Sequence, residues 1–218
     1  MWSKARRLMA AFLIAGSLLT GSVAYGDAYY SGKGNPDLAA TGLVVYGTSM
    51  NGSGFFVKGG YFVTAAHVVE GHEGAQLLIP DDLKLLKTEL VAKDRSRDLA
   101  LFKVAGAEEH WYLDLADAGS ASSYYTYGNG INENEFFSKH DGYLVSFNEW
   151  YNIGYTWGVQ SMHMDRYTFP AYGGSSGSAV LNDKGKVVGV VSARREGDNA
   201  ALVIPLTSLK EFLAQHGL

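Results

Sequence analysis

Cysteine is absent from the 218 residues, and proline and charged residues are scarce. Without cysteine the fold has neither a disulfide nor a thiolate metal site, so this feature alone leaves the redox compartment undecided. The chain has four prolines, and 18% of its residues are charged whereas 47% are apolar. This balance excludes an intrinsically disordered chain and supports a sizeable buried core.

The charge of the chain is also low. A net charge of −4, with no stripe of Lys and Arg beyond the N-terminus, gives no field that attracts polyanions, so nucleic acid is not expected as a partner. Five histidines show no metal-ligand spacing, and we expect neither a metal nor a cofactor. They are His72, His110, His140, His163 and His216.

Glycine and tyrosine are abundant, with 27 and 14 residues. This composition favours many short strands joined by tight turns, so the expected class is all-β. A chain of this length fits a single compact domain, because all-β barrels of this size commonly fold as one unit.

The N-terminal segment has the layout of a secretory signal peptide over residues 1–24. Three basic residues within the first seven precede an apolar run over 8–24, which ends in Ser22-Val23-Ala24. We expect cleavage after Ala24 and export to the periplasm or the medium. The alternative is an uncleaved anchor formed by residues 8–24, and contact with a membrane is expected only in that case.

Residues 25–40 are interpreted as a linker, and the domain is expected over 41–218. Short apolar runs separated by turn signals predict six strands in each half, the first half over about 41–117 and the second over about 118–205. Apolar spacing predicts a final helix over 206–216. The predicted strands are 43–46, 54–57, 61–64, 76–79, 88–92 and 99–104, then 124–127, 143–147, 153–159, 178–181, 186–193 and 200–204.

His67 is the first candidate catalytic residue. A strand of bulky residues gives way to Ala65-Ala66-His67, and small neighbours leave the imidazole room and access. A histidine with such access can act as a general base. The alternative is a histidine that is merely hydrogen-bonded at a strand end.

Asp98 is the second candidate, placed directly before the apolar run Leu99-Ala100-Leu101. A carboxylate buried there is costly unless it is paired. Aspartate at a turn before a strand is also ordinary, so this motif alone decides nothing.

Ser176 is the third candidate, in Gly173-Gly174-Ser175-Ser176-Gly177-Ser178. Glycines let the backbone bend sharply and approach a substrate closely, as a nucleophilic serine requires. Three serines compete for this role, and a Gly/Ser loop without chemistry is the alternative.

These motifs, in the order His, Asp, Ser, resemble those of the trypsin-like serine peptidases, most closely the bacterial Deg/HtrA branch. The resemblance covers nearly all of 41–218 and implies two six-stranded antiparallel β-barrels of the chymotrypsin-like type, with a C-terminal helix. It implies His67 as general base, Asp98 as its orienting carboxylate and Ser176 as nucleophile. The backbone N–H groups of Gly174 and Ser176 would form the oxyanion hole.

Two departures from the family limit what the resemblance implies. The regulatory PDZ domain of many relatives is not found, which puts cage assembly in doubt, and no oligomeric state is predicted. Six residues before the nucleophile, where trypsin has an acid, stands Pro170, so cleavage after Lys or Arg is not expected. Arg194 is expected either to narrow the pocket or to attract an acidic side chain, and small or medium apolar side chains are expected before the scissile bond. The expected pocket walls are Pro170, Ala171 and Tyr172 on one side and Ser192, Ala193 and Arg194 on the other.

The sequence therefore predicts an exported serine endopeptidase that acts on polypeptides and needs no cofactor. The alternative is a catalytically inactive, protease-like binding protein. It would use the aromatic side chains of the second half, in the region from Tyr124 to Tyr172, to hold a peptide or a glycan.

Overall fold

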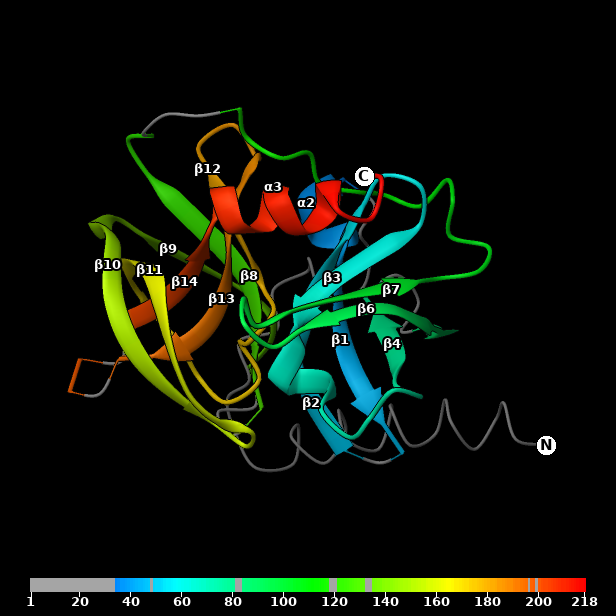
Figure 1. Ribbon diagram of the computed structural model, residues 1–218. Helices are drawn as coiled ribbons and strands as arrows, with labels where there is room; N and C mark the ends of the chain where they lie inside the picture. Colours follow the sequence, from blue (N-terminus) through cyan, green and yellow to red (C-terminus); the bar gives the residue numbers. More distant parts are fainter. Residues whose placement is uncertain are drawn as a thin grey trace, which may run out of the picture.

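A computed structural model describes residues 34–47, 49–80, 84–117, 121–131, 135–195, 197–198 and 200–218 (Figure 1). The predicted signal peptide, and the predicted linker up to residue 33, lie outside the described residues. Helix α2 (Pro36–Ala39) begins at Asn35, whose side chain accepts a hydrogen bond from the Leu38 N–H group at 3.1 Å. Leu38 is fully buried. The linker prediction is therefore wrong from Pro36 onward, because this end of the segment packs into the core.

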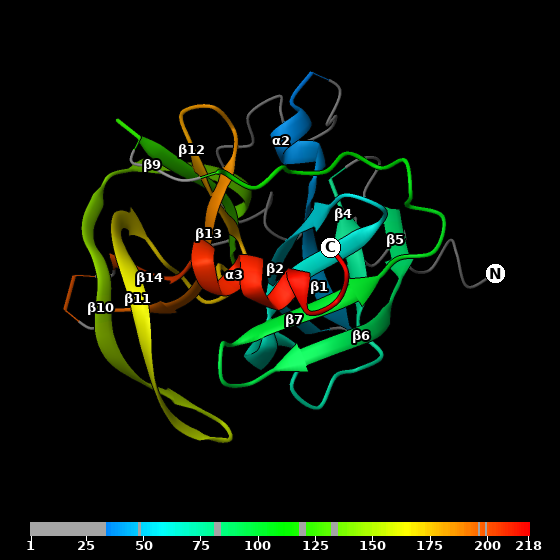
Figure 2. The same cartoon turned by 45° about the horizontal axis from the view of Figure 1, so that its top comes forward.

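The first half folds into an antiparallel sheet of seven strands in the order β5-β4-β1-β2-β3-β7-β6. β5 and β6 lie at opposite edges of the sheet, yet Thr88 alone separates them in the chain. One bent segment thus supplies both edges and closes the sheet into a barrel (Figure 2). The strands are β1 (Thr41–Tyr46), β2 (Ser49–Val57), β3 (Tyr61–Ala65), β4 (Gln76–Ile79), β5 (Lys84–Lys87), β6 (Glu89–Asp94) and β7 (Leu99–Lys103).

The second half repeats this plan in the order β10-β11-β14-β13-β12-β8-β9, and Tyr143 alone separates the two edge strands, β9 and β10. The predicted pair of antiparallel barrels is confirmed. Each sheet has seven strands rather than six because the bent edge segment counts twice. The strands are β8 (Tyr124–Gly130), β9 (Glu135–Gly142), β10 (Leu144–Tyr155), β11 (Gly158–Pro170), β12 (Ala179–Asn182), β13 (Val187–Arg194) and β14 (Ala200–Pro205).

One predicted strand is wrong. Residues 153–159 do not form a single strand, because the β10–β11 hairpin turns between Tyr155 and Gly158. Gly158 has a φ of +122°, which glycine adopts easily and other residues rarely do. Strand β9 is also absent from the prediction, since its Ser138-Lys139-His140-Asp141 run is polar and lacks an apolar alternation.

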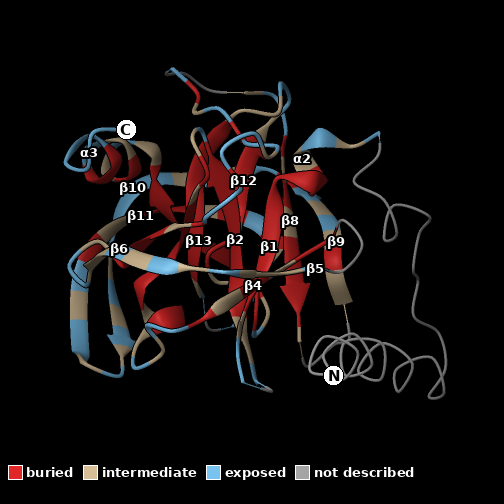
Figure 3. Cartoon of the chain, turned by 90° about the vertical axis from the view of Figure 1, so that its right-hand side faces the viewer, coloured by how far each residue is buried: buried red, intermediate tan, exposed pale blue. Residues whose placement is uncertain are grey.

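The largest buried cluster is shared by the two barrels. It joins Phe55 and Leu101 of the first barrel to Met164 and Ile204 of the second. Helix α3 (Leu206–Ala214) adds Phe212 and covers one end, in agreement with the predicted C-terminal helix. Figure 3 shows the central strands buried and the outer ones exposed. In the described part of the chain, no helix is long and apolar enough to cross a membrane.

Candidate active site

The register of β3 and β7 brings His67 to Asp98. Ala65 pairs with Leu99, and the Ala66 N–H group donates to the Asp98 carbonyl oxygen at 3.0 Å. His67 follows in the short helix η2 (Ala66–Val69). The two residues before His67, Ala65 and Ala66, are fully buried. Two residues that lie 31 positions apart in the chain therefore meet at the ends of neighbouring strands.

The Asp98 carboxylate is fully buried and accepts hydrogen bonds from three donors. The His67 N–H group lies 2.9 Å from Oδ1, and His67 Nδ1 lies 2.8 Å from Oδ2. The Ser192 hydroxyl of β13 donates to Oδ2 at 2.6 Å. Asp98 has a φ of +55°, a strained conformation that this network holds in place. These donors offset the cost of burying the charge.

Ser176 lies in the loop between β11 and β12, where glycine is required. Gly177 has a φ of +92°, and a Cβ atom there would stand 2.0 Å from the Ser53 carbonyl oxygen. Of the three neighbouring serines, Ser175 is 6% exposed and Ser178 is fully buried, whereas Ser176 is partly exposed. Only the Ser176 hydroxyl is thus open to a substrate.

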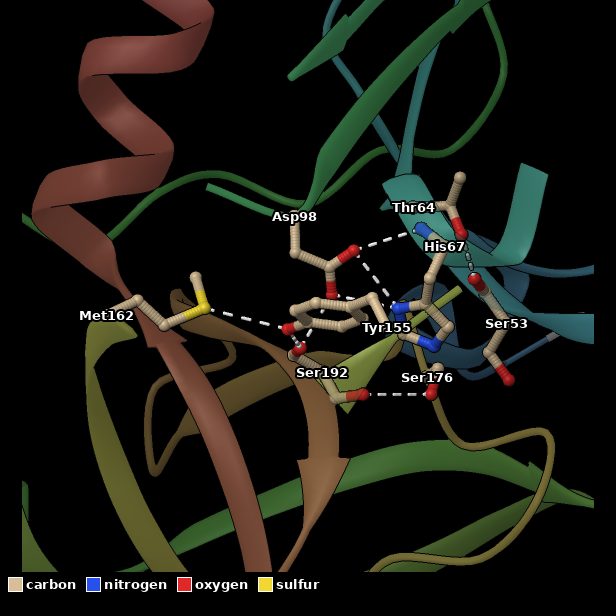
Figure 4. A network of polar contacts seen from close by, with 8 residues as sticks. All are labelled: Ser53, Thr64, His67, Asp98, Tyr155, Met162, Ser176 and Ser192. Carbon is tan, nitrogen blue, oxygen red and sulfur yellow. Dashed lines mark hydrogen bonds and ion pairs between the residues drawn. The ribbon is translucent and has the colours of Figure 1, made fainter. Parts of the chain in front are cut away.

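Figure 4 shows the Ser176 side chain next to the imidazole of His67, with its hydroxyl directed at the Ser192 carbonyl oxygen. This hydrogen bond is 3.1 Å long, and none from Ser176 to the His67 ring is recorded among the described residues. When the ring is neutral and His67 Nδ1 donates to the Asp98 carboxylate, which as an anion only accepts, Nε2 is left as an acceptor. A rotation of the Ser176 side chain would direct its proton to that acceptor.

Ser53 of β2 fixes the loop that carries Ser176, a role that the sequence did not reveal. Its N–H group donates to the Ser176 carbonyl oxygen at 2.8 Å, and its hydroxyl donates to the Gly174 carbonyl oxygen at 2.7 Å. The buried Asn129 side chain donates to the same hydroxyl at 2.7 Å. The glycines on either side of Ser53 were the available signal, since a glycine inside a strand often marks a close backbone approach.

The backbone N–H groups of Gly174 and Ser176 were the predicted oxyanion donors. In the described part of the chain, no protein acceptor is recorded for either group. The bonds from Ser53 hold the carbonyl oxygens of both residues on the side of the first barrel. That these two N–H groups form an oxyanion hole stays a prediction.

The residues predicted as pocket walls gather at the start of β14. Pro170 pairs with Ala200, and Arg194 pairs with Ala201. Ala171 and Tyr172 follow Pro170, Ala193 precedes Arg194, and the Arg194 side chain is exposed. The Ser192 side chain faces Asp98, so only the backbone of Ser192 is available to a substrate.

Tyr155, at the end of β10, also contacts this site. Its hydroxyl lies 2.8 Å from Ser192 Oγ, and its ring centroid lies 5.5 Å from that of His67. Burial, and then the nearby Asp98 charge, raise the pKa of Tyr155 above its usual value.

Within the described residues, no group of three or more acidic or histidine side chains could hold a metal ion.

Comparison with protein families gives a match over residues 52–190 to the family described as "Trypsin-like peptidase domain". The chain is also 26% identical, over 159 residues, to the glutamyl endopeptidase of Staphylococcus epidermidis. That alignment covers 68% of this chain and 56% of the relative, so the chain spans little more than half of that protein.

Solved structures share the fold. The Rv3671c protease from M. tuberculosis in its active form superposes with a TM-score of 0.72 at 18% identity, covering 82% of this chain and 81% of that one. The HtrA-type protease AlgW, solved with a decapeptide, gives a TM-score of 0.63 at 18% identity. The match covers 78% of this chain and 53% of that one. At such identities the likeness supports the fold alone.

Proposed function

Because the chain belongs to the family of trypsin-like peptidase domains, we propose that it is a serine endopeptidase that hydrolyses polypeptides through His67, Asp98 and Ser176. The observation that carries this proposal is the buried Asp98 carboxylate bonded to His67 Nδ1 at 2.8 Å, with the partly exposed Ser176 side chain next to the same imidazole (Figure 4). An imidazole held in this tautomer can take a proton at Nε2.

The reaction follows from this geometry. The Ser176 oxygen attacks the peptide carbonyl carbon while its proton passes to His67 Nε2, and Asp98 stabilises the resulting imidazolium. The N–H groups of Gly174 and Ser176 stabilise the negative oxygen of the tetrahedral intermediate. His67 then gives the proton to the leaving amine, and an acyl-enzyme remains. Water, deprotonated by His67, attacks the acyl-enzyme and releases the carboxylic acid and the free serine.

The side-chain preference depends on Arg194. Arg194 is exposed, and its backbone pairs with Ala201 near the start of β14, beside the expected pocket, where the side chain either narrows the pocket or attracts an acidic side chain. The name of the glutamyl endopeptidase relative supports an acidic residue before the scissile bond. Exchange of Arg194 for Gln would then reduce cleavage after Glu more than cleavage after Ala.

Export rests on the sequence of residues 1–24, where basic residues precede an apolar run. N-terminal sequencing of the mature protein tests this proposal. A mature chain that begins at Tyr25 supports cleavage after Ala24, whereas an intact N-terminus supports an anchor over residues 8–24.

The activity is tested with a library of unstructured peptides, in which new termini are identified by mass spectrometry. The wild-type protein is expected to cut peptide bonds, with Glu, Ala and Lys compared at the residue before the cut. The Ser176→Ala variant is the matched control and should produce no new termini. A folded wild-type protein that binds peptides without cutting them would support the inactive, protease-like binding protein instead.

A further inference from the structure

The tip of the β10–β11 hairpin reaches from the second barrel to the His67–Asp98 pair of the first. Figure 4 shows the Tyr155 ring beside the imidazole and its hydroxyl directed at Ser192. The ring planes of Tyr155 and His67 are inclined by 32°, with centroids 5.5 Å apart. The hydroxyl also lies 3.5 Å from the Met162 sulfur. A residue of the second barrel thus contacts the base and the hydrogen-bond network of the first.

The direction of the hydrogen bonds follows from counting hydrogens. The Ser192 hydroxyl has one hydrogen, and it donates this hydrogen to Asp98 Oδ2 at 2.6 Å because the carboxylate only accepts. The Tyr155 hydroxyl, 2.8 Å from Ser192 Oγ, is therefore the donor of the second bond, and its single hydrogen goes to this oxygen rather than to the more distant and weaker acceptor, the Met162 sulfur. The raised pKa of Tyr155 keeps this donor protonated throughout the neutral and mildly alkaline range. Tyr155, Ser192, Asp98 and His67 form one continuous, directed chain.

We propose that Tyr155 is a positioning residue for catalysis, acting on His67 through Ser192 and Asp98. The proposal rests on the proposed peptidase function. By donating to Ser192, Tyr155 fixes the rotamer in which Ser192 donates to Asp98, and it polarises that second bond. Its ring covers the pair from the side of the second barrel. The carboxylate is then held in one orientation, which in turn orients the imidazole toward Ser176.

A stack of side chains holds Tyr155 in place. Trp157 lies parallel to Tyr155, with ring centroids 4.8 Å apart and an interplanar angle of 13°. The Arg95 guanidinium lies 5.6 Å from the Trp157 ring, and Arg95 is paired in turn with Glu70. Glu70 directly follows the short helix that carries His67. The hairpin tip is thus attached to the first barrel next to the base that it positions.

The test is the Tyr155→Phe variant, which keeps the ring and removes only the hydroxyl. We expect kcat to fall by about fivefold to tenfold, as for the loss of one buried hydrogen bond, with KM changed less than twofold. The proton NMR resonance of the bond between His67 and Asp98 should shift. The matched control is Tyr151→Phe in the same strand, whose hydroxyl bonds to the exposed Glu149 and should leave both readouts unchanged.

A double-mutant cycle with Ser192→Ala distinguishes positioning from general destabilisation. Once Ser192 cannot transmit the effect, Tyr155→Phe should cause no further loss of kcat. Additive losses, or a change in KM alone, would overturn the positioning role. The NMR readout is independent of turnover: a wild-type protein without peptidase activity contradicts the proposed function, while an unchanged resonance in Tyr155→Phe contradicts the role of Tyr155.

Discussion

Two buried aspartates, one in each barrel, have very different surroundings. Asp98 of the first barrel is fully buried and accepts hydrogen bonds from the His67 backbone, the His67 ring and Ser192. Asp165 of β11 is 3% exposed, and the one hydrogen bond recorded for its side chain in the described residues comes from the Asn148 N–H group, at 2.8 Å. Burial raises the pKa of Asp165.

The difference lies in the number of hydrogen-bond donors that face each buried carboxylate. At Asp98 the donors come from both barrels, because the site lies where β3, β7 and β13 approach one another. At Asp165 a single donor opposes the cost of burial. The Asp98 carboxylate serves the proposed chemistry, whereas a charge on Asp165 lowers the free energy of unfolding at neutral pH.

The largest expected effect is that of Asp98→Asn. The amide matches the carboxylate in shape but presents an NH₂ donor, so it no longer selects the tautomer with the hydrogen on His67 Nδ1. Loss of the orienting carboxylate in this type of site lowers kcat by about 10⁴-fold. Steady-state kinetics measure this loss, and thermal unfolding checks that the variant folds. A loss below tenfold in a folded variant would remove Asp98 from the proposed catalytic unit.

The next largest effect is expected for Ser53→Ala, which breaks the link between the first barrel and the nucleophile loop. The Gly174 carbonyl oxygen and the Asn129 side chain would each lose a buried partner. We expect the free energy of unfolding to fall by about 2 kcal/mol. The kcat value should fall by roughly tenfold as the proposed oxyanion donors lose their fixed orientation.

Ser49→Ala, in the same strand but at an exposed position, is the matched control for Ser53→Ala. Urea denaturation and steady-state kinetics of both variants provide the measurement. Equal effects of the two substitutions would show that Ser53 does not fix the loop.

The smallest effect, and one of opposite sign, is expected for Asp165→Asn. Since the pKa of Asp165 is raised in the folded state, the folded protein holds this proton to a higher pH than the unfolded chain does. Stability is therefore lost as the pH rises from the ordinary aspartate range through the folded pKa. Asparagine keeps an acceptor for the Asn148 N–H group and removes the charge.

Asp165→Asn should accordingly raise the free energy of unfolding at pH 7, with no gain at pH values below the ordinary aspartate range. Chemical denaturation at both pH values measures the difference, and peptidase activity should be unchanged. A variant that is less stable than the wild type at pH 7 would contradict the comparison between the two aspartates.

The parts of the site that could be predicted from the sequence are those encoded in short segments. Glycines around Ser176, alanines before His67 and an apolar strand after Asp98 are local requirements, and each can be seen within a few residues. The two barrels could be predicted for the same reason, from strand-length apolar runs separated by turns.

The supporting contacts could not be predicted, because they depend on strand pairing over long distances in the chain. Ser53 and Gly174 are 121 positions apart, and Asp98 and Ser192 are 94 apart. Nothing local marks Tyr155 as a hydrogen-bond donor to the network. The hairpin turn at Thr156-Trp157 also resembled the middle of a strand, since β-branched and aromatic residues favour strands.

The central claim is that His67 activates Ser176. Labelling with a fluorophosphonate probe, followed by peptide mapping, tests it most directly. The wild-type protein should carry the adduct on Ser176, and His67→Ala should lose the labelling while remaining folded. An adduct on Ser175 or Ser178, equal labelling of the His67→Ala variant, or no labelling of the folded wild-type protein would contradict the account.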